Sequence, residues 1–549
     1  MDRPTAPHSE GPIAYGPPGA MLPGAMNQST TPIGRTADSR LHRLSWPTAL
    51  ALLAGASVLS GCGGAEEVER PNVILITLDT VRADFLSCYG STSGATPAVD
   101  RLAAAGTVFE DAASSSGLTP ASHATILTGN FQYNHGLRVL AAGSGYKLDP
   151  DQETLTTAFK AAGYRTAAIH SAFPVSAFFG FDEGFDEFES FDATLKKKKD
   201  DTKVGWDVRS YQRRSDDTTR MAVDWLKEAS QGDEPFFLWL HYWDPHDPVK
   251  MPDEADFERL RYDPGTGEIQ DEATINYAVE VRYQDGNLET LFAAIDDAGL
   301  TEETLVALTA DHGQGLADGM RKHRWGMHRM LYREQTHVPF ILRGPGIPAG
   351  QRVPDQVRTA DMAPTLLDYA GLGDFGEPVD GTSLRPWIEG EKEGDLTAYG
   401  EQINGYDHNA GMRKFRPDAA FLYMVSDGDW KLIYKPHMPG TSELFHVGVD
   451  PLEERNVIAD HPDVVVNLLA DLAERNPWVT APFPIEGASS PSGSADALNA
   501  LGYSAADVEG SGDWWWTCPA HTDQRLDRRG RCEVDGCGRI TISMGRWTE

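Results

Sequence analysis

Short apolar runs without regular polar alternation recur along the chain from residue 72 onward. The first run covers residues 72–78 and stops at Asp79, and the others lie at residues 166–169, 236–240, 305–309 and 338–342. Runs of this length are typical of strands that are buried on both faces, as in a parallel sheet covered by helices. The pattern therefore predicts a largely buried central sheet.

Helical patterns separate these runs and lie at residues 98–105, 155–162, 219–230 and 275–298. Strands that alternate with helices predict an α/β fold with a mainly parallel sheet flanked by helices. Ligands bind such open sheets beyond the carboxyl ends of the strands. Asp79, His241 and Asp311 follow predicted strands directly. We therefore expect a functional site at this edge of the sheet.

The pattern changes character at about residue 396. Before that point the alternation predicts one large domain over residues 71–395. Beyond it, shorter elements predict a smaller α+β subdomain over residues 396–478, with strands at 430–434 and 443–446 and a helix at 463–475. A stretch rich in Pro, Gly and Ser then predicts a linker over residues 479–512, followed by a small tail over residues 513–549.

The N-terminal segment reads as a targeting signal. Arg40 and Arg43 precede an apolar run at residues 50–59, which ends in the sequence Leu-Ser-Gly-Cys62. A charged start, a short apolar stretch and small residues at the end are typical of a secretory signal, and the run is too short to span a bilayer. The sequence predicts a leader over residues 1–62 and a flexible tether over residues 63–70.

The ending at Cys62 resembles the bacterial lipobox. This resemblance implies that Cys62 is lipidated, and that the mature protein is anchored to a membrane of the bacterial cell envelope. A buried helix with an unrelated cysteine remains the alternative interpretation.

The formal net charge of the chain is -34. A chain with this charge is not expected to bind nucleic acid, because it could not neutralise a row of phosphates. An anionic substrate would have to be held by a local group of cations. The five cysteines are too few to form a disulfide framework for a chain of 549 residues.

Residues 119–129 read Thr-Pro-Ala-Ser-His-Ala-Thr-Ile-Leu-Thr-Gly. This run resembles the active-site signature of the sulfatase family within the alkaline-phosphatase superfamily. Thr119 occupies the position of the Cys or Ser that sulfatases convert to formylglycine. Ala121 and His123 replace the usual Pro and Arg.

Further blocks follow in the order known from this family, at residues 78–84, 244–248, 311–313 and 337–340. The resemblance spans residues 72–475 and implies an alkaline-phosphatase-like fold. It also implies hydrolysis of a small-molecule or polysaccharide sulfate ester. An unmodified Thr119 resembles the phosphodiesterase branch, so a phosphodiesterase or phosphonate monoester hydrolase is the alternative. A non-catalytic lipoprotein that binds anionic glycans is a third hypothesis.

The resemblance implies a site for one divalent cation, Ca, Mn or Zn, bound by Asp79, Thr119, Asp311 and His312. Thr80 and His312 replace an Asp and an Asn of the usual calcium site, and a nitrogen ligand favours Mn or Zn. Contact with the cation would lower the pKa of the Thr119 hydroxyl and so activate it as a nucleophile.

The remaining catalytic candidates are cations and imidazoles. His246 and His328 would contact the ester oxygens or protonate the leaving group, as the resemblance implies. His123 would face the same anion, Arg138 would act as a charge clamp, and His241 is equally compatible with a structural role. A second metal is not expected, because Asp244 is followed at the required spacing by Pro248 and not by His.

The tail contains Cys518-Pro-Ala-His521, Cys532 and Cys537. It resembles a short heavy-metal-binding domain, and three Cys with one His form the usual composition of a tetrahedral zinc site. A surface disulfide with one free thiol is the alternative.

Overall fold

The computed structural model describes most of the chain between residues 70 and 479. The described ranges are 70–91, 96–140, 146–189, 212–246, 262–263, 267–268, 272–316, 328–405, 417–479, 515–518, 521–526 and 542–544. The chain falls into two compact units, Met1–Glu66 and Glu67–Glu549, and all described residues belong to the second. Cys62, Cys532 and Cys537 lie outside the described residues.

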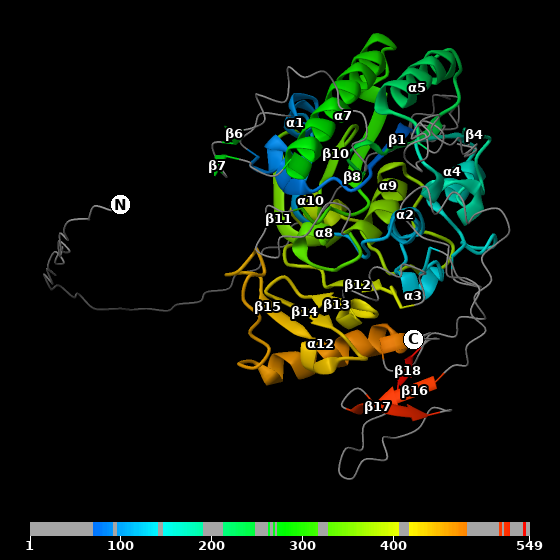
Figure 1. Ribbon diagram of the computed structural model, residues 1–549. Helices are drawn as coiled ribbons and strands as arrows, with labels where there is room; N and C mark the ends of the chain where they lie inside the picture. Colours follow the sequence, from blue (N-terminus) through cyan, green and yellow to red (C-terminus); the bar gives the residue numbers. More distant parts are fainter. Residues whose placement is uncertain are drawn as a thin grey trace, which may run out of the picture. The chain divides into compact units, whose positions relative to one another are not determined.

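A nine-stranded mixed sheet forms the centre of the second unit (Figure 1). Its strand order is β11-β2-β10-β8-β1-β5-β3-β4, and β9 pairs with β2. The strands are β1 (Asn72–Leu78), β2 (Thr107–Ala113), β3 (Arg165–His170), β4 (Glu187–Glu189), β5 (Phe236–Tyr242), β8 (Thr304–Ala310), β9 (His337–Val338), β10 (Phe340–Arg343) and β11 (Gln351–Arg358). The central strand β1 runs parallel to both β5 and β8. The predicted α/β class is therefore confirmed.

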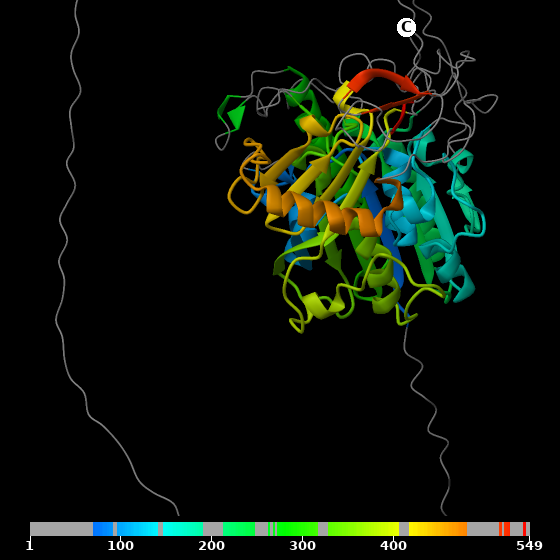
Figure 2. The same cartoon turned by 90° about the horizontal axis from the view of Figure 1, so that it is seen from below.

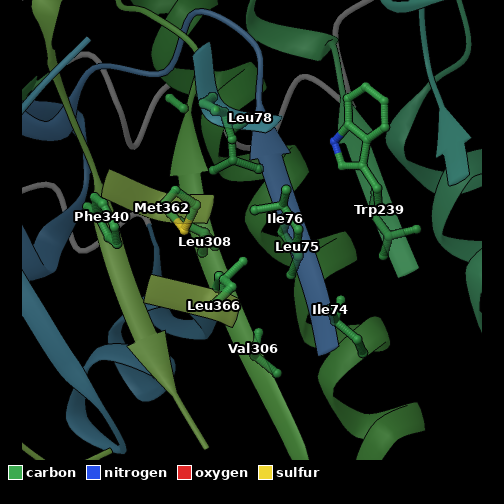
Figure 3. Packing of buried hydrophobic residues seen from close by; sticks show 14 of the residues in the cluster. Ile74, Leu75, Ile76, Leu78, Trp239, Val306, Leu308, Phe340, Met362 and Leu366 are labelled. Atoms are coloured by element: carbon green, nitrogen blue, oxygen red, sulfur yellow. The ribbon is translucent and has the colours of Figure 1, made fainter. Parts of the chain in front are cut away.

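Helices cover the central sheet in two groups. One group is α1 (Pro97–Ala104), α5 (Ser215–Ala229) and α7 (Glu272–Asp297), which pack against one another (Figures 1 and 2). The other group is α2 (Thr119–Thr128), α4 (Leu155–Ala161) and α9 (Met362–Tyr369). Met362 and Leu366 of α9 lie against the central strands (Figure 3). Coverage by two groups of helices explains why the central strands lack polar alternation.

The core is built mainly from the central strands. Val73, Ile74, Leu75 and Ile76 of β1 are all fully buried, as is Trp239 of β5. Each fully buried side chain of this size contributes roughly 1.5–3 kcal/mol. The sheet is therefore a rigid support for the residues that follow its strands.

A second, antiparallel sheet contains β12 (Ala398–Gln402), β13 (Leu422–Ser426), β14 (Trp430–Tyr434) and β15 (Glu443–His446). Helix α12 (Pro462–Arg475) packs on it through Leu468 and Leu472. The sequence predicted β14, β15 and α12 closely, but it did not predict β12 and β13. Among the described residues, no helix combines the length and apolar composition that a membrane span requires.

Two local differences from the sequence prediction have a clear cause. The predicted strand at 338–342 is divided into β9 and β10 by Pro339, which has no N–H to donate to the ladder. Helix α5 begins at Ser215, four residues before the predicted start, because the Asp244 carboxylate accepts hydrogen bonds from the Ser215 N–H and hydroxyl. That cap comes from a distant part of the chain.

Candidate active site

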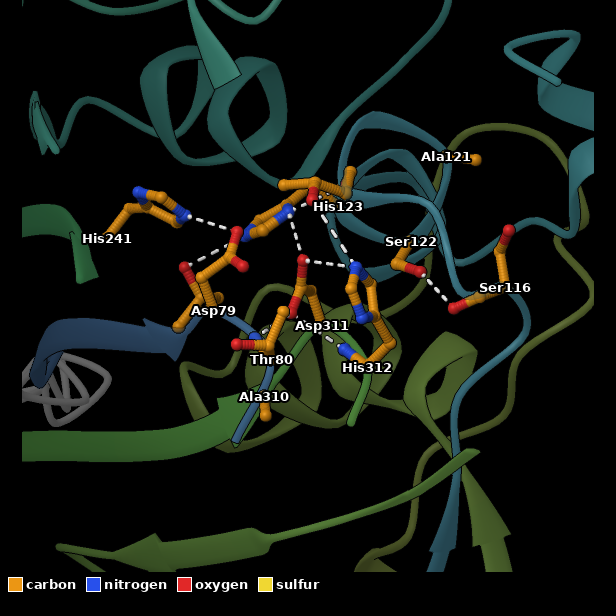
Figure 4. Close-up of polar contacts among 12 residues, drawn as sticks. Asp79, Thr80, Ser116, Ala121, Ser122, His123, His241, Ala310, Asp311 and His312 are labelled. Atoms are coloured by element: carbon orange, nitrogen blue, oxygen red, sulfur yellow. Dashed lines mark hydrogen bonds and ion pairs between the residues drawn. The ribbon is translucent and has the colours of Figure 1, made fainter. Parts of the chain in front are cut away.

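Two adjacent strands deliver the acidic residues of the site. Leu78 at the end of β1 pairs with Ala310 at the end of β8, so that Asp79 and Asp311 emerge side by side at the same edge of the sheet. Both carboxylates are fully buried. Figure 4 shows them facing one another with His312 beside Asp311.

Asp79, Asp311 and His312 each offer one ligand atom, and these atoms lie within 4.8 Å of one another. Oδ1 of Asp311 accepts hydrogen bonds from the N–H groups of Thr80 (3.0 Å) and His312 (2.7 Å). Asp311 Oδ2 and Asp79 Oδ1 have no hydrogen-bond partner among the described residues. Buried carboxylate oxygens left in this way fit a divalent cation.

The electrostatics of the pair agree with this interpretation. Burial, together with the neighbouring Asp311 carboxylate, raises the pKa of Asp79 well above its ordinary value. The two charges therefore oppose each other unless a proton or a cation lies between them.

The tautomer of His312 suits a metal ligand. Its Nδ1–H donates to the carbonyl of Gly313 at 2.9 Å, because a carbonyl can only accept. Nε2 consequently carries the lone pair, and it lies 3.3 Å from Thr119 Oγ1 and 3.4 Å from Asp311 Oδ2. A backbone carbonyl that fixes the second ring nitrogen is a common support for a ligating histidine.

Thr119 is buried and is the first residue of helix α2. The amino end of a helix presents free N–H groups and a partial positive charge, both of which stabilise an anion. The Thr119 hydroxyl is thus close to an imidazole acceptor and lies at a position where negative charge is tolerated.

His123 lies behind Thr119 and is held on both ring nitrogens. Its Nδ1–H donates to the Thr119 carbonyl at 2.8 Å, so Nε2 accepts from the Thr77 hydroxyl at 3.1 Å. Thr77 in turn accepts from Trp239 Nε1 at 3.0 Å. Burial lowers the pKa of His123, which makes it a neutral group that supports Thr119 from behind. The cation expected from the usual Arg is thus not supplied by His123.

His241 orients the first carboxylate. Its Nδ1 accepts from the N–H of Ser171, and its Nε2–H therefore points to Asp79 Oδ2, each at 3.4 Å. Burial and the nearby His123 lower the pKa of His241 well below its ordinary value. This geometry gives His241 the position of an outer support for Asp79.

A row of imidazoles continues outward from the acidic pair. The His328 ring lies 5.2 Å from the His312 ring and 5.0 Å from the His246 ring, and Trp243 stacks on His246 at 3.9 Å. Burial lowers the pKa of His246 to about 3 and that of His328 well below its ordinary value. Neutral imidazoles bind an anion through N–H donors without repelling a cation at the acidic pair.

Arg329 was missed by the sequence analysis. Its side chain is buried, and its positive charge contributes to the lowered pKa of both His246 and His328. It supplies a cation beside the row of imidazoles. The signal available in the sequence was a basic residue directly after His328.

The backbone of Thr80 was also not anticipated. This residue has φ of +57°, a conformation that is strained for a β-branched side chain. Its carbonyl accepts from the Tyr277 hydroxyl at 2.7 Å, and its N–H binds Asp311. This strained turn places the residues that follow β1 in contact with Asp311.

Arg138 and Asp244 both form structural contacts. The guanidinium of Arg138 forms a buried bidentate ion pair with Glu401, and the structure does not bring it to the acidic pair as expected for a charge clamp. Asp244 binds Arg214 at 3.2 Å and caps α5 through Ser215. Among the described residues, one group of side chains could hold a metal ion, namely Asp79, Asp311 and His312.

Comparisons with known proteins match most of the described chain. The family model described as Sulfatase matches residues 71–372, and that described as N-sulphoglucosamine sulphohydrolase, C-terminal, matches residues 321–476. N-acetylglucosamine-6-O-sulfatase from Bacteroides thetaiotaomicron is 24% identical over 507 residues, covering 75% of this chain and 87% of that protein. Arylsulfatase K from Bos taurus is 25% identical over 483 residues, covering 77% and 86%.

A solved structure shares the fold. The crystal structure of the phosphonate monoester hydrolase of Agrobacterium radiobacter aligns with a TM-score of 0.58 and 22% identity, covering 75% of this chain and 96% of that chain. The architecture is therefore common to hydrolases of sulfur and phosphorus esters.

The acidic pair predicts a pH-dependent stability in the absence of metal. The pKa of Asp79 is raised above its ordinary 3.8 in the folded state, so its contribution to the free energy of unfolding is present below that value and lost as pH rises through the folded pKa. We expect urea denaturation in EDTA to show falling stability upward from about pH 4, and added Mn²⁺ or Zn²⁺ to restore it at neutral pH.

Asp79→Asn should flatten this pH dependence and abolish the stabilisation by metal. Asp380→Asn is the matched control: it changes a half-buried carboxylate outside the cluster, which accepts hydrogen bonds from Phe131 and Asn134, and the variant should keep the stabilisation by metal. Superimposable wild-type curves in EDTA and in Mn²⁺ would contradict the assignment.

Proposed function

This chain belongs to the sulfatase family of sulfuric ester hydrolases, and we propose that it acts with an unmodified Thr119 as its nucleophile. The observation that carries the proposal is the position of Thr119 Oγ1, 3.3 Å from His312 Nε2 of the candidate metal cluster and at the amino end of α2. The hydroxyl thus lies where a bound cation and the end of a helix would both stabilise its alkoxide.

The family normally uses a divalent metal, and Asp79, Asp311 and His312 would hold it in this chain. When bound, a divalent cation lowers the pKa of a nearby hydroxyl and offsets the charge of the substrate. The nitrogen ligand His312 favours Mn or Zn over Ca.

The reaction needs two displacements at the same atom. Thr119 Oγ1 forms a bond to sulfur while the bond from sulfur to the leaving oxygen breaks, and water carries the Thr119 proton to the leaving oxygen. The neutral His246 and His328 would hold that oxygen through their N–H groups. Water then attacks sulfur, releases sulfate and restores Thr119. Threonine lacks the second hydroxyl of a formylglycine hydrate, so release by elimination does not apply.

A sulfated carbohydrate is the substrate class we propose. The support is the similarity to N-acetylglucosamine-6-O-sulfatase along three quarters of the chain. The neighbouring rings of His246 and His328, whose N–H groups can bind an anion, provide local donors for an anionic ester on an acidic protein.

A phosphonate monoester or phosphodiester is the second candidate. It is favoured by the unmodified Thr119, by the imidazole ligand His312, and by the fold shared with a phosphonate monoester hydrolase. Water attack on a covalent intermediate is more familiar at phosphorus than at sulfur.

Removal of the nucleophile tests the proposal. Thr119→Ala should lower turnover on the order of a thousandfold or more while substrate binding survives. Thr119→Ser, which retains a hydroxyl, should keep part of the activity, and Thr128→Ala removes a buried hydroxyl at the far end of the same helix as a control.

The assay compares an aryl sulfate, an aryl phosphate diester and an aryl phosphonate monoester, each with Mn²⁺, Zn²⁺ or Ca²⁺ added back. The preferred ester separates the two candidate functions. Thr119→Ala with wild-type turnover on the best ester would exclude Thr119 as nucleophile.

We also propose that the tail binds one zinc or similar ion through Cys518, His521, Cys532 and Cys537. The support is the Cys and His spacing, together with the register of β16 (Trp515–Cys518) and β17 (His521–Leu526), in which Cys518 pairs with His521. The full-length double variant Cys532→Ser, Cys537→Ser should lose one equivalent of zinc by elemental analysis under reducing conditions and retain turnover. Unchanged zinc content would refute the site.

Cys62 carries the last part of the proposal, a lipid anchor in the bacterial cell envelope. Its support is the lipobox-like ending of the apolar run. Mass spectrometry of the mature protein should find a diacylated N-terminal cysteine at this position, and Cys62→Ser should release the protein from the membrane fraction. An unmodified N-terminus before Cys62 would rule this out.

A further inference from the structure

Residues 329–336 form a strap that directly follows His328. Met330, Leu331 and Tyr332 of the strap are buried in a hydrophobic cluster with residues of the second sheet, namely Leu422 and Met424 of β13, Ile433 of β14 and Phe445 of β15. The strap therefore packs on the second sheet, whereas His328 stacks on His312 of the main sheet.

The main body approaches the strap from the other side at backbone distance. A Cβ atom on Gly117 would lie 1.8 Å from the His328 carbonyl oxygen, and one on Gly313 would lie 2.2 Å from the Glu334 carbonyl oxygen. The Gly313 N–H also donates to the Gln335 carbonyl at 2.8 Å. Gly117 precedes Thr119 by two residues, and Gly313 directly follows His312. The strap therefore touches both of the segments that carry the proposed reacting groups.

Polar contacts from the second sheet and the loop that follows β12 hold the beginning of the strap. Asn404 Nδ2 donates to the Arg329 carbonyl at 2.9 Å. The Tyr332 hydroxyl donates to Glu443 Oε2 of β15 at 2.7 Å. A hydrogen bond to a charged group is about twice as strong as one between neutral groups, so Glu443 is an effective anchor.

The end of the strap rests on a buried ion pair. Glu453 Oε2 accepts from the Arg333 N–H at 2.9 Å, while its Oε1 pairs with Lys431 Nζ at 2.6 Å. Lys431 also donates to Thr336 Oγ1 at 3.1 Å. Glu453 has φ of +54°, a strained conformation that the surrounding contacts must maintain.

We propose that the second sheet positions His328 for the reaction, with Glu443, Asn404 and Glu453 as positioning residues. The inference rests on the proposed function, because it takes His328 as a group that acts on the substrate. The strap cannot shift toward Gly117 and Gly313 or toward the second sheet, because it contacts both. The ring of His328 is therefore held in its stacked position on His312.

The test removes one hydroxyl. Tyr332→Phe deletes the contact with Glu443 and leaves the buried ring in place. The matched control is Tyr399→Phe, which deletes a hydroxyl that donates to the Asp471 carboxylate at the same distance of 2.7 Å, on the same sheet but away from the strap. Thermal unfolding should show a similar loss for both variants.

With 4-nitrophenyl sulfate and Mn²⁺, Tyr332→Phe should lower kcat about tenfold, the scale of one hydrogen bond to a charged group, with KM changed less than twofold. Hydrogen–deuterium exchange of the strap peptide should accelerate. Tyr399→Phe should change neither quantity. Tyr332→Phe with faster exchange but wild-type kcat would overturn the proposal.

A double-mutant cycle identifies the route. In a His328→Ala background, Tyr332→Phe should cause no further loss of kcat, because the group that it positions is gone. An equal loss in both backgrounds, or wild-type kcat in His328→Ala, would overturn the proposal. Thr119→Ala tests the proposed nucleophile separately. If Thr119→Ala loses turnover while Tyr332→Phe keeps it, the assignment of Thr119 as nucleophile stands and the positioning role of the second sheet is excluded.

Discussion

Two carboxylates that are buried next to each other govern the design of this site. Asp79 and Asp311 are both fully removed from solvent, and burying an ionised group costs several kcal/mol in a real protein. Hydrogen-bond donors reach one oxygen of each carboxylate, Asp79 Oδ2 and Asp311 Oδ1. The other two oxygens, Asp79 Oδ1 and Asp311 Oδ2, have no hydrogen-bond partner among the described residues. A divalent cation would relieve both the repulsion and the desolvation, so this edge of the sheet is suited to hold a metal.

The shell of histidines is consistent with that need. His123, His241, His246 and His328 all have lowered pKa values, with burial as the largest cause. His123 and His241 use both of their ring nitrogens inside the protein, and each hydrogen bond determines the tautomer. Neutral imidazoles support Thr119 and Asp79 without adding positive charges that would compete with a cation for the carboxylates.

The second sheet contributes to the site from outside. Not every residue of the candidate site follows a strand of the main sheet. His328 directly precedes a segment that packs on β13, β14 and β15. The close backbone approach at Gly117 and Gly313 leaves no room for that segment to move inward. In the proposed mechanism, the two sheets together hold His328 and Thr119 at a defined separation, which suits chemistry that depends on position.

The apolar runs by themselves determined the α/β class, the central strands and the edge at which Asp79, His241 and Asp311 stand. Burial on both faces leaves a direct record in the sequence, because most positions of such a strand are apolar. The motif around Thr119 and the pair Asp311-His312 likewise indicated a candidate nucleophile and candidate metal ligands from local sequence. The structure has β1, β5 and β8 at the predicted runs, with His241 inside β5 and not after it, and it brings Asp79, Asp311 and His312 together.

Only the tertiary structure decided how those residues are used. Arg138 reads as a free cation in sequence, but Glu401, 263 residues away, neutralises it. The strained φ of Thr80, the tautomer of His312 and the charge of Arg329 beside His246 depend on contacts between distant segments. A sequence pattern records the burial of each residue but not the identity of its neighbours, and hydrogen bonds and charges are set by those neighbours.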